Sequence, residues 1–287
     1  MLNRSLAQVC FAFTFVLSAT RVVTAQTDTI ASVLSTPRSC PTAFSTIHHD
    51  GINALRAMGH VLAGPTHWCG TDLLVAGGIA GATAVSYSLD GKVYNLMERN
   101  RSAFNDDATN IAVEYGSGYF AIGVPATLYI SGLLLKDTWT RETAIVVGST
   151  VLLTSAITTV GKIVIGRARP YTGLGRHTFK PFEVRDDFMS FPSGHTTAAF
   201  ALSASLAARI KNPWASIGLY GLAAAAATSR MYTRDHWLSD VVFSAVYTTV
   251  VAKSMARCFE NEESREDEGT SLRIVPTESG VGVVWLF

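Results

Sequence analysis

Stretches without charged residues alternate with short polar segments through the middle of the chain. Six such stretches lie at residues 73–89, 115–135, 143–161, 196–208, 213–229 and 241–252, and all are rich in Ala, Gly, Val, Ser and Thr. The polar segment between the first two, from Asp90 to Glu114, is expected to form a helical surface followed by a loop. The alternation of apolar and polar residues that marks a half-buried strand is missing between residues 70 and 257. The pattern therefore predicts an all-α fold, a bundle of about six apolar helices.

Different patterns flank this bundle. Before it, apolar residues recur at helical spacing and predict an amphipathic helix from Phe44 to Leu62, which Gly64-Pro65 ends. This helix contains His48-His49-Asp50, which lacks an Asp or His partner at useful spacing, so we expect a solvated helix face and not a metal site. After the bundle, the acidic run Glu260–Glu268 is expected to be a solvated linker. Leu272–Pro276 and Val281–Phe287 then predict a small β-hairpin.

The first residues resemble a secretory signal. Arg4 precedes a short apolar core at Val9–Leu17, and small residues lead to Ala25. A retained anchor helix is the alternative, and either case implies export to the periplasmic face of the cell envelope. The expected organisation is a signal peptide at 1–25, an N-terminal extension at 26–69, the bundle at 70–257 and a tail at 258–287. In an exported protein, Cys40 and Cys69 are candidates for a disulfide.

The composition indicates that the bundle could lie in a membrane and not only in water. Charged residues make up 16% of the chain, against about a quarter in typical soluble domains, and the mean hydropathy is +0.26. A net charge of +1 gives no global attraction to nucleic acid. The second and third apolar stretches are long enough to span a membrane, and the basic turns at 136–141, 209–211 and 253–257 lie at one end of the bundle. Two arrangements stay open, a soluble bundle or a membrane bundle with the first helix lying against it; the basic turns favour membrane association.

Three polar stretches carry candidate chemistry, and the first closes the third apolar stretch. Lys162 and Arg169 lie seven residues apart, so they can share a helix face, and Pro170 is expected to end that helix. Arginine suits a bidentate grip on phosphate oxygens, and lysine adds a point charge. A basic helix end that caps the helix dipole or faces lipid headgroups is the alternative interpretation.

The second stretch is Pro192-Ser193-Gly194-His195, at the start of an Ala-rich run. Proline early in a helix loses no hydrogen bond, Ser193 is a good N-cap, and Gly194 allows close approach to the backbone. Free N–H groups at such a helix start suit a phosphate. His195 stands at its mouth, although a lone histidine there is more often structural than catalytic.

The third stretch, Ser229-Arg230 to Asp240, joins the last two apolar stretches. His236 and Asp240 are four residues apart, so their side chains can meet on a helix. A carboxylate on one imidazole nitrogen fixes the tautomer and leaves the other nitrogen as nucleophile or base. An ordinary surface pair is the alternative. In an up-down bundle all three stretches fall at one end, and this combination favours a phosphoryl-transfer site.

Together the stretches resemble the signature of the type 2 phosphatidic acid phosphatase/vanadium haloperoxidase superfamily over about residues 70–257. That signature is a Lys, six residues and Arg-Pro, then Pro-Ser-Gly-His, then Ser-Arg, five residues, His, three residues and Asp; it is matched here without a gap. The resemblance implies that His236 attacks phosphorus, Asp240 supports it, and His195 protonates the leaving alcohol and then activates water. It implies phosphate binding by Lys162, Arg169, Ser193, Gly194 and Arg230, with no metal or cofactor.

The function expected from this resemblance is a metal-independent phosphatase that hydrolyses a phosphomonoester or diphosphate, of a lipid at a membrane, through a phosphohistidine. The alternatives are a soluble periplasmic non-specific acid phosphatase and a vanadate-dependent haloperoxidase, whose relatives are generally much larger. A phosphorylated lipid or small phosphoester is the expected partner. The loop from Tyr171 to Ser190 carries Arg176, His177, Lys180 and Arg185, which fits either headgroup recognition or a solvated loop.

Overall fold

A computed structural model describes residues 43–269, 271–277 and 280–286 of the chain. The predicted signal peptide and Cys40, one half of the candidate disulfide, lie outside these residues. In chain order the elements are α2 (Ala43–Ala63), η1 (Gly64–His67), α3 (Gly70–Arg99), α4 (Ala103–Ala112), η2 (Val113–Gly116), α5 (Gly118–Leu135), α6 (Thr138–Ile165), η3 (Pro170–Thr172), η4 (Asp186–Phe188), α7 (Gly194–Ile210), α8 (Pro213–Tyr232), α9 (Leu238–Gly269), β1 (Ser271–Thr277) and β2 (Gly280–Leu286).

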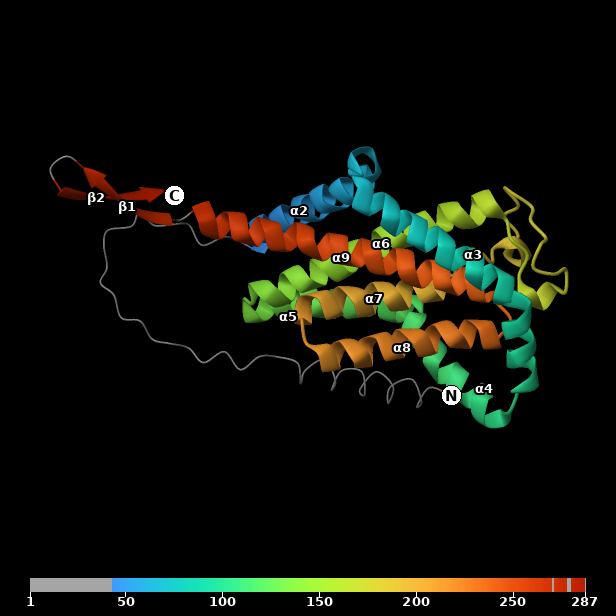
Figure 1. The fold of residues 1–287 in the computed structure, drawn as a ribbon. Helices are drawn as coiled ribbons and strands as arrows, with labels where there is room; N and C mark the ends of the chain where they lie inside the picture. The colour runs from blue at the N-terminus through green and yellow to red at the C-terminus, as the bar shows by residue number, and fades with distance from the viewer. Residues whose placement is uncertain (1–42, 270, 278–279, 287) are drawn as a thin grey trace. The chain divides into compact units, whose positions relative to one another are not determined.

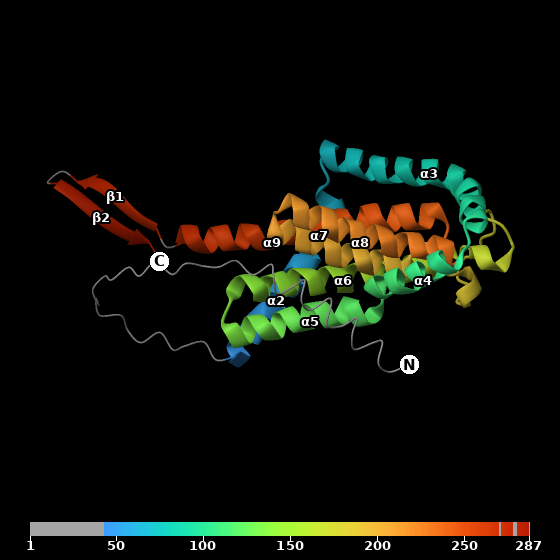
Figure 2. The same ribbon diagram turned by 90° about the horizontal axis from the view of Figure 1, so that it is seen from below.

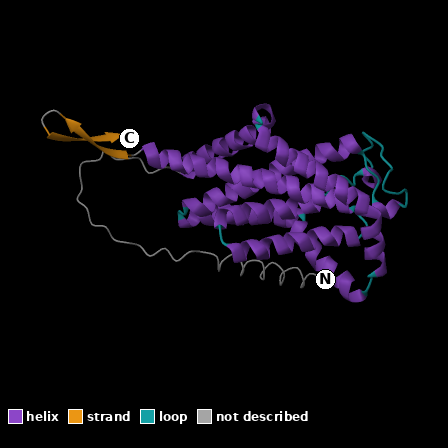
Figure 3. Cartoon of the chain, viewed as in Figure 1, coloured by secondary structure: helices purple, strands orange, loops and turns teal. Residues whose placement is uncertain are grey.

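The all-α prediction is confirmed. Each of the six apolar stretches forms most or part of one long helix, and within the described residues the only named strands are the two of the C-terminal hairpin (Figure 3). Helix α7 packs against α6, α8 and α9, while α5 lies along α6 and α3 contacts α9 (Figures 1 and 2). The hairpin is also confirmed, with Ser271 opposite Leu286 and Thr277 opposite Gly280.

Small residues explain why α7 can lie at the centre. Its Ala199 is fully buried against Ala223 and Ala226 of α8, so the two helices approach closely without large side chains between them. A second apolar cluster joins α2, α6 and α9 through Ala57, Leu153 and Met255, among others. The bundle is therefore held by close backbone packing on one side and by larger side chains on the other.

The N-terminal helix forms as predicted, but Asp50 does not lie on a solvated face. Its side chain is buried and pairs with Arg141 of α6 at 2.9 Å, while the Tyr129 hydroxyl of α5 donates to it at 2.9 Å. A buried carboxylate needs such partners because it loses its hydration. Asp50 thus fastens α2 to the α5–α6 pair, whereas the neighbouring His48 and His49 are exposed as expected.

Two polar segments are more helical than the sequence suggested. The first apolar stretch continues as helix through the polar residues up to Arg99, and Asp90, which we expected on a helical surface, is 1% exposed. The acidic run after residue 260 continues α9 to Gly269 and is not a linker. In both cases the helix is longer than its apolar stretch, because Glu, Lys and Arg are good helix formers and the one glycine in the polar part of α3, Gly91, does not end it.

Three described helices are long and apolar enough to cross a membrane: α3, α5 and α6, with mean hydropathies of 1.3, 1.5 and 1.8 over their most apolar segments. In α3 and α5 only 6% and 11% of that segment is buried within the protein. The sequence argument identified the second and third stretches as long enough; α3 now joins them. Large apolar side chains such as Leu74, Ile122 and Leu134 are more than two-thirds exposed.

Candidate active site

The three polar stretches meet at one end of the bundle, as the sequence predicted. They occupy the C-terminal end of α6, the start of α7, and the connection from α8 to α9, at the right of Figure 1. Arg169 of the first stretch pairs with Asp235 of the third, and His236 of the third contacts Ser190, which lies just before the second. The loop between α6 and α7 closes over the same end.

Helix α6 ends earlier than predicted, so Lys162 and Arg169 do not share a helix face. Gly166 stops the helix with a left-handed φ of 58°, and Pro170 lies beyond the helix. A Cβ at residue 166 would lie 1.8 Å from the carbonyl oxygen of Lys180, so only glycine fits. Lys162 therefore reaches the site from the last helical turn, and Arg169 reaches it from the loop.

The two arginines of the site, Arg169 and Arg230, already have carboxylate partners. Arg169 pairs with Asp186 at 2.6 Å and with Asp235 at 3.1 Å, and Arg230 pairs with the same Asp235 at 2.8 Å. The Nε atoms of Arg169 and Arg230 are buried and have no hydrogen-bond partner among the described residues. Buried donors normally find an acceptor, so these two leave room for the oxygens of an anion.

The start of α7 forms as predicted around Ser193, whose Oγ accepts a long hydrogen bond of 3.4 Å from the Thr196 N–H. We expected Pro192 early in the helix, but it lies before the N-cap Ser193, outside the helix. Ser193 is fully buried, and its own N–H donates to the Ser244 hydroxyl at 2.8 Å. A Cβ on Gly194 would lie 3.9 Å from Lys162 Cε, so the lysine runs beside the helix start.

The two histidines are both held neutral at pH 7. Burial lowers the pKa of His195 to about 4, with a further contribution from Arg230, and burial lowers the pKa of His236 to about 4. His236 Nδ1 lies 2.6 Å from the Ser190 carbonyl oxygen. A carbonyl only accepts, so Nδ1 carries the proton and Nε2 keeps its lone pair. This is the tautomer of a nucleophilic histidine.

Asp240 is not the nearest partner of His236. Its Oδ2 lies 3.7 Å from Nδ1, beyond hydrogen-bond distance, and accepts from the Ser190 hydroxyl at 2.5 Å and the Trp237 N–H at 2.8 Å. The expected direct bond between His236 and Asp240 is therefore replaced by a path through Ser190. This residue binds the imidazole with its carbonyl and the carboxylate with its hydroxyl.

Comparison with known proteins gives a family likeness for part of the chain. The family model of the PAP2 superfamily matches residues 143–264, which contain all three polar stretches. These residues are therefore similar to the PAP2 superfamily. It is 32% identical over 115 residues to the lipid A 1-phosphatase of Rhizobium johnstonii, covering 38% of this chain and 46% of that protein. It is 28% identical over 161 residues to the lipid A 1-phosphatase of Rhizobium etli, covering 50% of this chain and 68% of that protein.

Two solved structures are also similar. The crystal structure of Aquifex aeolicus LpxE matches 59% of this chain and 95% of its own, at 19% identity and a TM-score of 0.45. The structure of a transmembrane PAP2 type phosphatidylglycerolphosphate phosphatase from Bacillus subtilis matches 66% of this chain and 96% of its own, at 16% identity and a TM-score of 0.48. The chain spans less than half the length of the Rhizobium johnstonii relative.

Sequence reasoning missed three residues of the candidate site: Ser190, Arg167 and Asp90. Arg167 stands between Lys162 and Arg169, is 1% exposed, and pairs with Asp240 at 2.5 Å and with Asp90 at 2.6 Å. A signal for Asp90 was present, because an acid that directly follows a charge-free run is costly to bury unless it is paired. No comparable signal marks Ser190, which acts through its backbone carbonyl as well as through its hydroxyl.

The loop between α6 and α7 is neither free nor simply solvated. Arg176 donates to the carbonyl oxygens of Tyr87 and Ser88 at 3.3 and 3.1 Å, and the His177 ring lies 2.7 Å from the Tyr87 hydroxyl. These two residues tie the loop to α3. Lys180 and Arg185 instead lie near the Phe188 ring, at 4.7 and 5.2 Å.

Proposed function

We propose that the chain is a phosphatase that hydrolyses a phosphate from a lipid at a membrane surface, through a phosphohistidine. The observation that carries this proposal is the pair of buried Nε donors of Arg169 and Arg230, which have no partner among the described residues and lie beside a neutral His236. Phosphate oxygens would complete both guanidinium groups, and the free Nε2 of His236 is a nucleophile. The fixed cations take the place that metal ions hold in other phosphoryl-transfer sites.

The proposed reaction has two balanced steps. His236 Nε2 attacks phosphorus, the bond from phosphorus to the alcohol oxygen breaks, and His195 gives its proton to the leaving alkoxide. Water then attacks the phosphohistidine while His195 takes a proton from it, and inorganic phosphate leaves. The pKa of His195 is about 4 in the ligand-free site. A bound phosphate dianion raises this pKa and so favours the proton-donating form.

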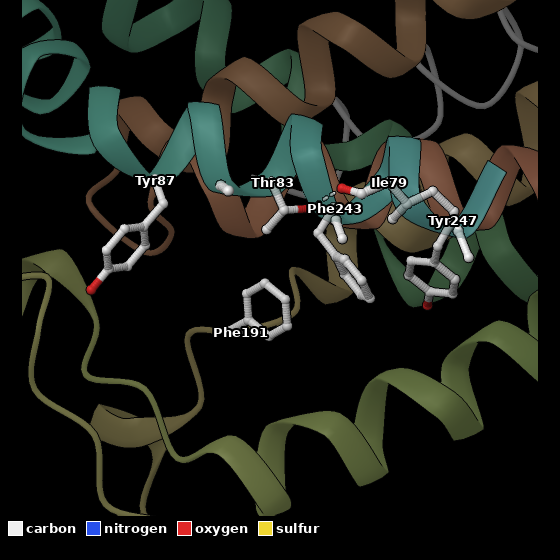
Figure 4. A pocket seen from close by; sticks show the side chains of 9 residues that line it. Ile79, Thr83, Tyr87, Phe191, Phe243 and Tyr247 are labelled. Atoms are coloured by element: carbon white, nitrogen blue, oxygen red, sulfur yellow. Dashed lines mark hydrogen bonds between the residues drawn. The ribbon is translucent and has the colours of Figure 1, made fainter. Parts of the chain in front are cut away.

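An apolar groove beside the site supports a lipid as the substrate. It has a volume of about 650 Å³ and is lined by residues of α3 and α9 together with Phe191, as Figure 4 shows. The hydroxyls on its wall are already bonded: Thr83 to the Ile79 carbonyl at 2.7 Å, and Tyr247 to the Thr154 carbonyl at 3.0 Å. The wall therefore offers mainly carbon, which suits an acyl chain. Phe191 directly precedes Pro192, so the groove leads to the phosphate end.

The exposed apolar helices support the proposal that the chain lies in a membrane. We propose that α5 and α6 cross the membrane and that the site faces the periplasm. The turn between them, with Lys136 and Arg141, lies at the end opposite the site, and basic loops stay in the cytoplasm. If α3 also spans the membrane, Cys69, which precedes it, lies on the cytoplasmic side. If α3 instead lies against the bundle, Cys69 lies outside the cytoplasm, as an exported N-terminus requires. Labelling of the exposed Cys69 in intact cells by an impermeant maleimide distinguishes these arrangements.

Phosphate release by the purified full-length chain in detergent tests the proposed reaction. The substrates are a lipid A phosphate, suggested by the names of the two relatives, with phosphatidate, a polyprenyl diphosphate and a soluble aryl phosphate, all in EDTA. We expect faster turnover of a lipid than of the aryl ester, and an acid-labile phosphoenzyme with labelled substrate that His236→Ala abolishes. Turnover by His236→Ala at the wild-type rate would overturn the mechanism, and a preference for the aryl ester would overturn the lipid substrate.

A further inference from the structure

We propose that Asp90 is a positioning residue for the reaction: through Arg167 it fixes Asp240, and through Asp240 and Ser190 it fixes the nucleophilic His236. This inference rests on the proposed function. Asp90 lies on α3, outside the residues that match the PAP2 family model and outside the three polar stretches. The site would thus depend on a helix that precedes it by more than 60 residues.

Asp90 is a buried carboxylate with both oxygens engaged. Its Oδ2 accepts from Arg167 Nη2 at 2.6 Å and from the Ser239 hydroxyl at 2.9 Å, and its Oδ1 accepts from the Ser239 N–H at 2.8 Å. Its side chain is fully buried. The contacts to Ser239 fall in the first turn of α9, one residue before Asp240. Asp90 therefore holds both the start of α9 and the guanidinium that faces Asp240.

Arg167 links the two carboxylates. Its Nη1 donates to Asp240 Oδ1 at 2.5 Å and to the Ser239 hydroxyl at 2.7 Å, while Nη2 faces Asp90. The rings of Tyr87 and Trp237 lie 4.9 and 5.5 Å from its guanidinium carbon. With Asp90 removed, the acceptor left to Nη2 is the Arg176 carbonyl at 3.2 Å. A planar guanidinium that loses one of two carboxylates turns toward the other, which changes the position of Asp240.

A shift of Asp240 would also shift His236, because Ser190 bonds to both residues. With Oδ1 held by Arg167, Oδ2 is directed at the Ser190 hydroxyl, and the Ser190 carbonyl accepts the Nδ1 proton of His236. The cluster of two carboxylates and one guanidinium also carries a net negative charge beneath His236. Phosphoryl transfer gives the imidazole a positive charge, so this cluster stabilises the transition state more than the ground state.

A matched control separates this role from the general cost of losing a buried ion pair. Asp50 is also buried and also pairs with an arginine, Arg141, but it lies between α2 and the α5–α6 pair, away from the site. Asp90→Asn and Asp50→Asn each remove one carboxylate charge while keeping the shape. We expect Asp90→Asn to lower kcat about 10- to 100-fold with KM within about twofold, as outer residues that orient catalytic groups typically do. Asp50→Asn should leave kcat unchanged.

A second variant and a second measurement cover the case in which Asp90→Asn folds poorly. Ser239→Ala keeps every charge and removes the hydroxyl that joins Arg167 to Asp90, and we expect a smaller fall in kcat. The ¹⁵N resonances of His236, assigned by their loss in His236→Gln, report whether Nδ1 carries the proton, with or without turnover. We expect Asp90→Asn and Ser239→Ala to mix the two tautomers and Asp50→Asn to keep one.

The outcomes distinguish the two proposals. One outcome is that the wild-type chain turns over substrate and that both Asp90→Asn and Ser239→Ala keep its kcat and its His236 tautomer. This outcome would overturn the role of Asp90 and leave the proposed function standing. A wild-type chain that releases no phosphate from any of the four substrates would overturn the proposed function, and the tautomer measurement would still decide whether Asp90 positions His236. Equal losses of kcat in Asp90→Asn and Asp50→Asn would show a general loss of folded protein and would also overturn the role.

Discussion

Replacement of Gly166 by alanine tests whether the end of α6 sets the position of Arg169, which we propose binds phosphate. A Cβ at residue 166 would lie 1.8 Å from the Lys180 carbonyl oxygen, whereas real contacts of this kind are essentially never under 3.0 Å. The Lys180 segment must therefore move by more than about 1 Å. Arg167 and Arg169 follow Gly166 directly, so they move with it.

Gly173 provides the matched control for this substitution. Both glycines have a left-handed φ, 58° at Gly166 and 69° at Gly173, but a Cβ at Gly173 meets open space. The left-handed conformation costs an alanine roughly 1–2 kcal/mol at either position. At Gly166 the clash also threatens two backbone hydrogen bonds of 2.7 Å, from the N–H of Lys180 and of Phe182 to the end of α6. At about 0.5–1.5 kcal/mol each, their loss brings the total cost to about 2–5 kcal/mol.

The assays are thermal unfolding in detergent and steady-state phosphate release by the same preparations. We expect Gly173→Ala to lose about 1–2 kcal/mol of stability and to keep its kcat/KM. Gly166→Ala should lose more stability and, because a displacement of about 1 Å in a positioned group costs on the order of 100-fold in rate, about two decades of kcat/KM. Equal stability and equal activity in the two variants would refute the reasoning.

Three further results are expected. Burial lowers the pKa of His236 to about 4, so between about pH 6.5 and 4 the unfolded chain binds a proton at this residue that the folded chain does not. As the pH is lowered through that window, the free energy of unfolding should therefore decrease, by up to about 3 kcal/mol at pH 4. The thermal midpoint of His236→Gln should decrease less over the same window. Arg230→Lys removes the buried Nε donor and the planar fork, so kcat/KM should fall about 100- to 1000-fold, and an unchanged value would argue against phosphate binding there. Gly116→Ala places a Cβ 2.5 Å from the His195 carbonyl oxygen, which should lower kcat by displacing the start of α7; wild-type kcat would show that η2 does not support this histidine.

The local pattern of the sequence was enough to place the site. The all-α bundle, the hairpin, the N-cap at Ser193 and the meeting of the three polar stretches at one end were all predicted, because each depends on spacing within a few residues. Helix ends were predicted less well. Pro170 is the more familiar helix breaker, but Gly166 ends α6 first, and the reason is the Lys180 carbonyl, which comes from a loop 14 residues later.

Contacts between distant elements account for what the sequence did not predict. Asp50 and Asp90 were both expected on helix surfaces because each stands in or beside a polar segment. Each is buried because an arginine far along the chain faces it: Arg141 for Asp50 and Arg167 for Asp90. Periodicity gives the face of a helix but not the identity of the group packed against it. The same limit hid Ser190, since its carbonyl could belong to any residue and its hydroxyl bonds Asp240, which is 50 residues away in the sequence.

The two buried aspartates also show that a charge in an apolar helix has to be interpreted through its partner. Breaking either pair removes a buried carboxylate that faces an arginine, although Arg167 keeps Asp240 and Arg141 is partly exposed. Both changes cost stability, so stability alone cannot separate the two roles. Position does separate them. The partner of Asp50 contacts only structural helices, whereas the guanidinium that pairs with Asp90 also holds Asp240 at 2.5 Å, two hydrogen bonds from the nucleophile through Ser190. Helix α3, which lies outside the family match, therefore reaches the site through Asp90, which bonds both Arg167 and Ser239, and the proposed chemistry of the three polar stretches depends on a residue in none of them.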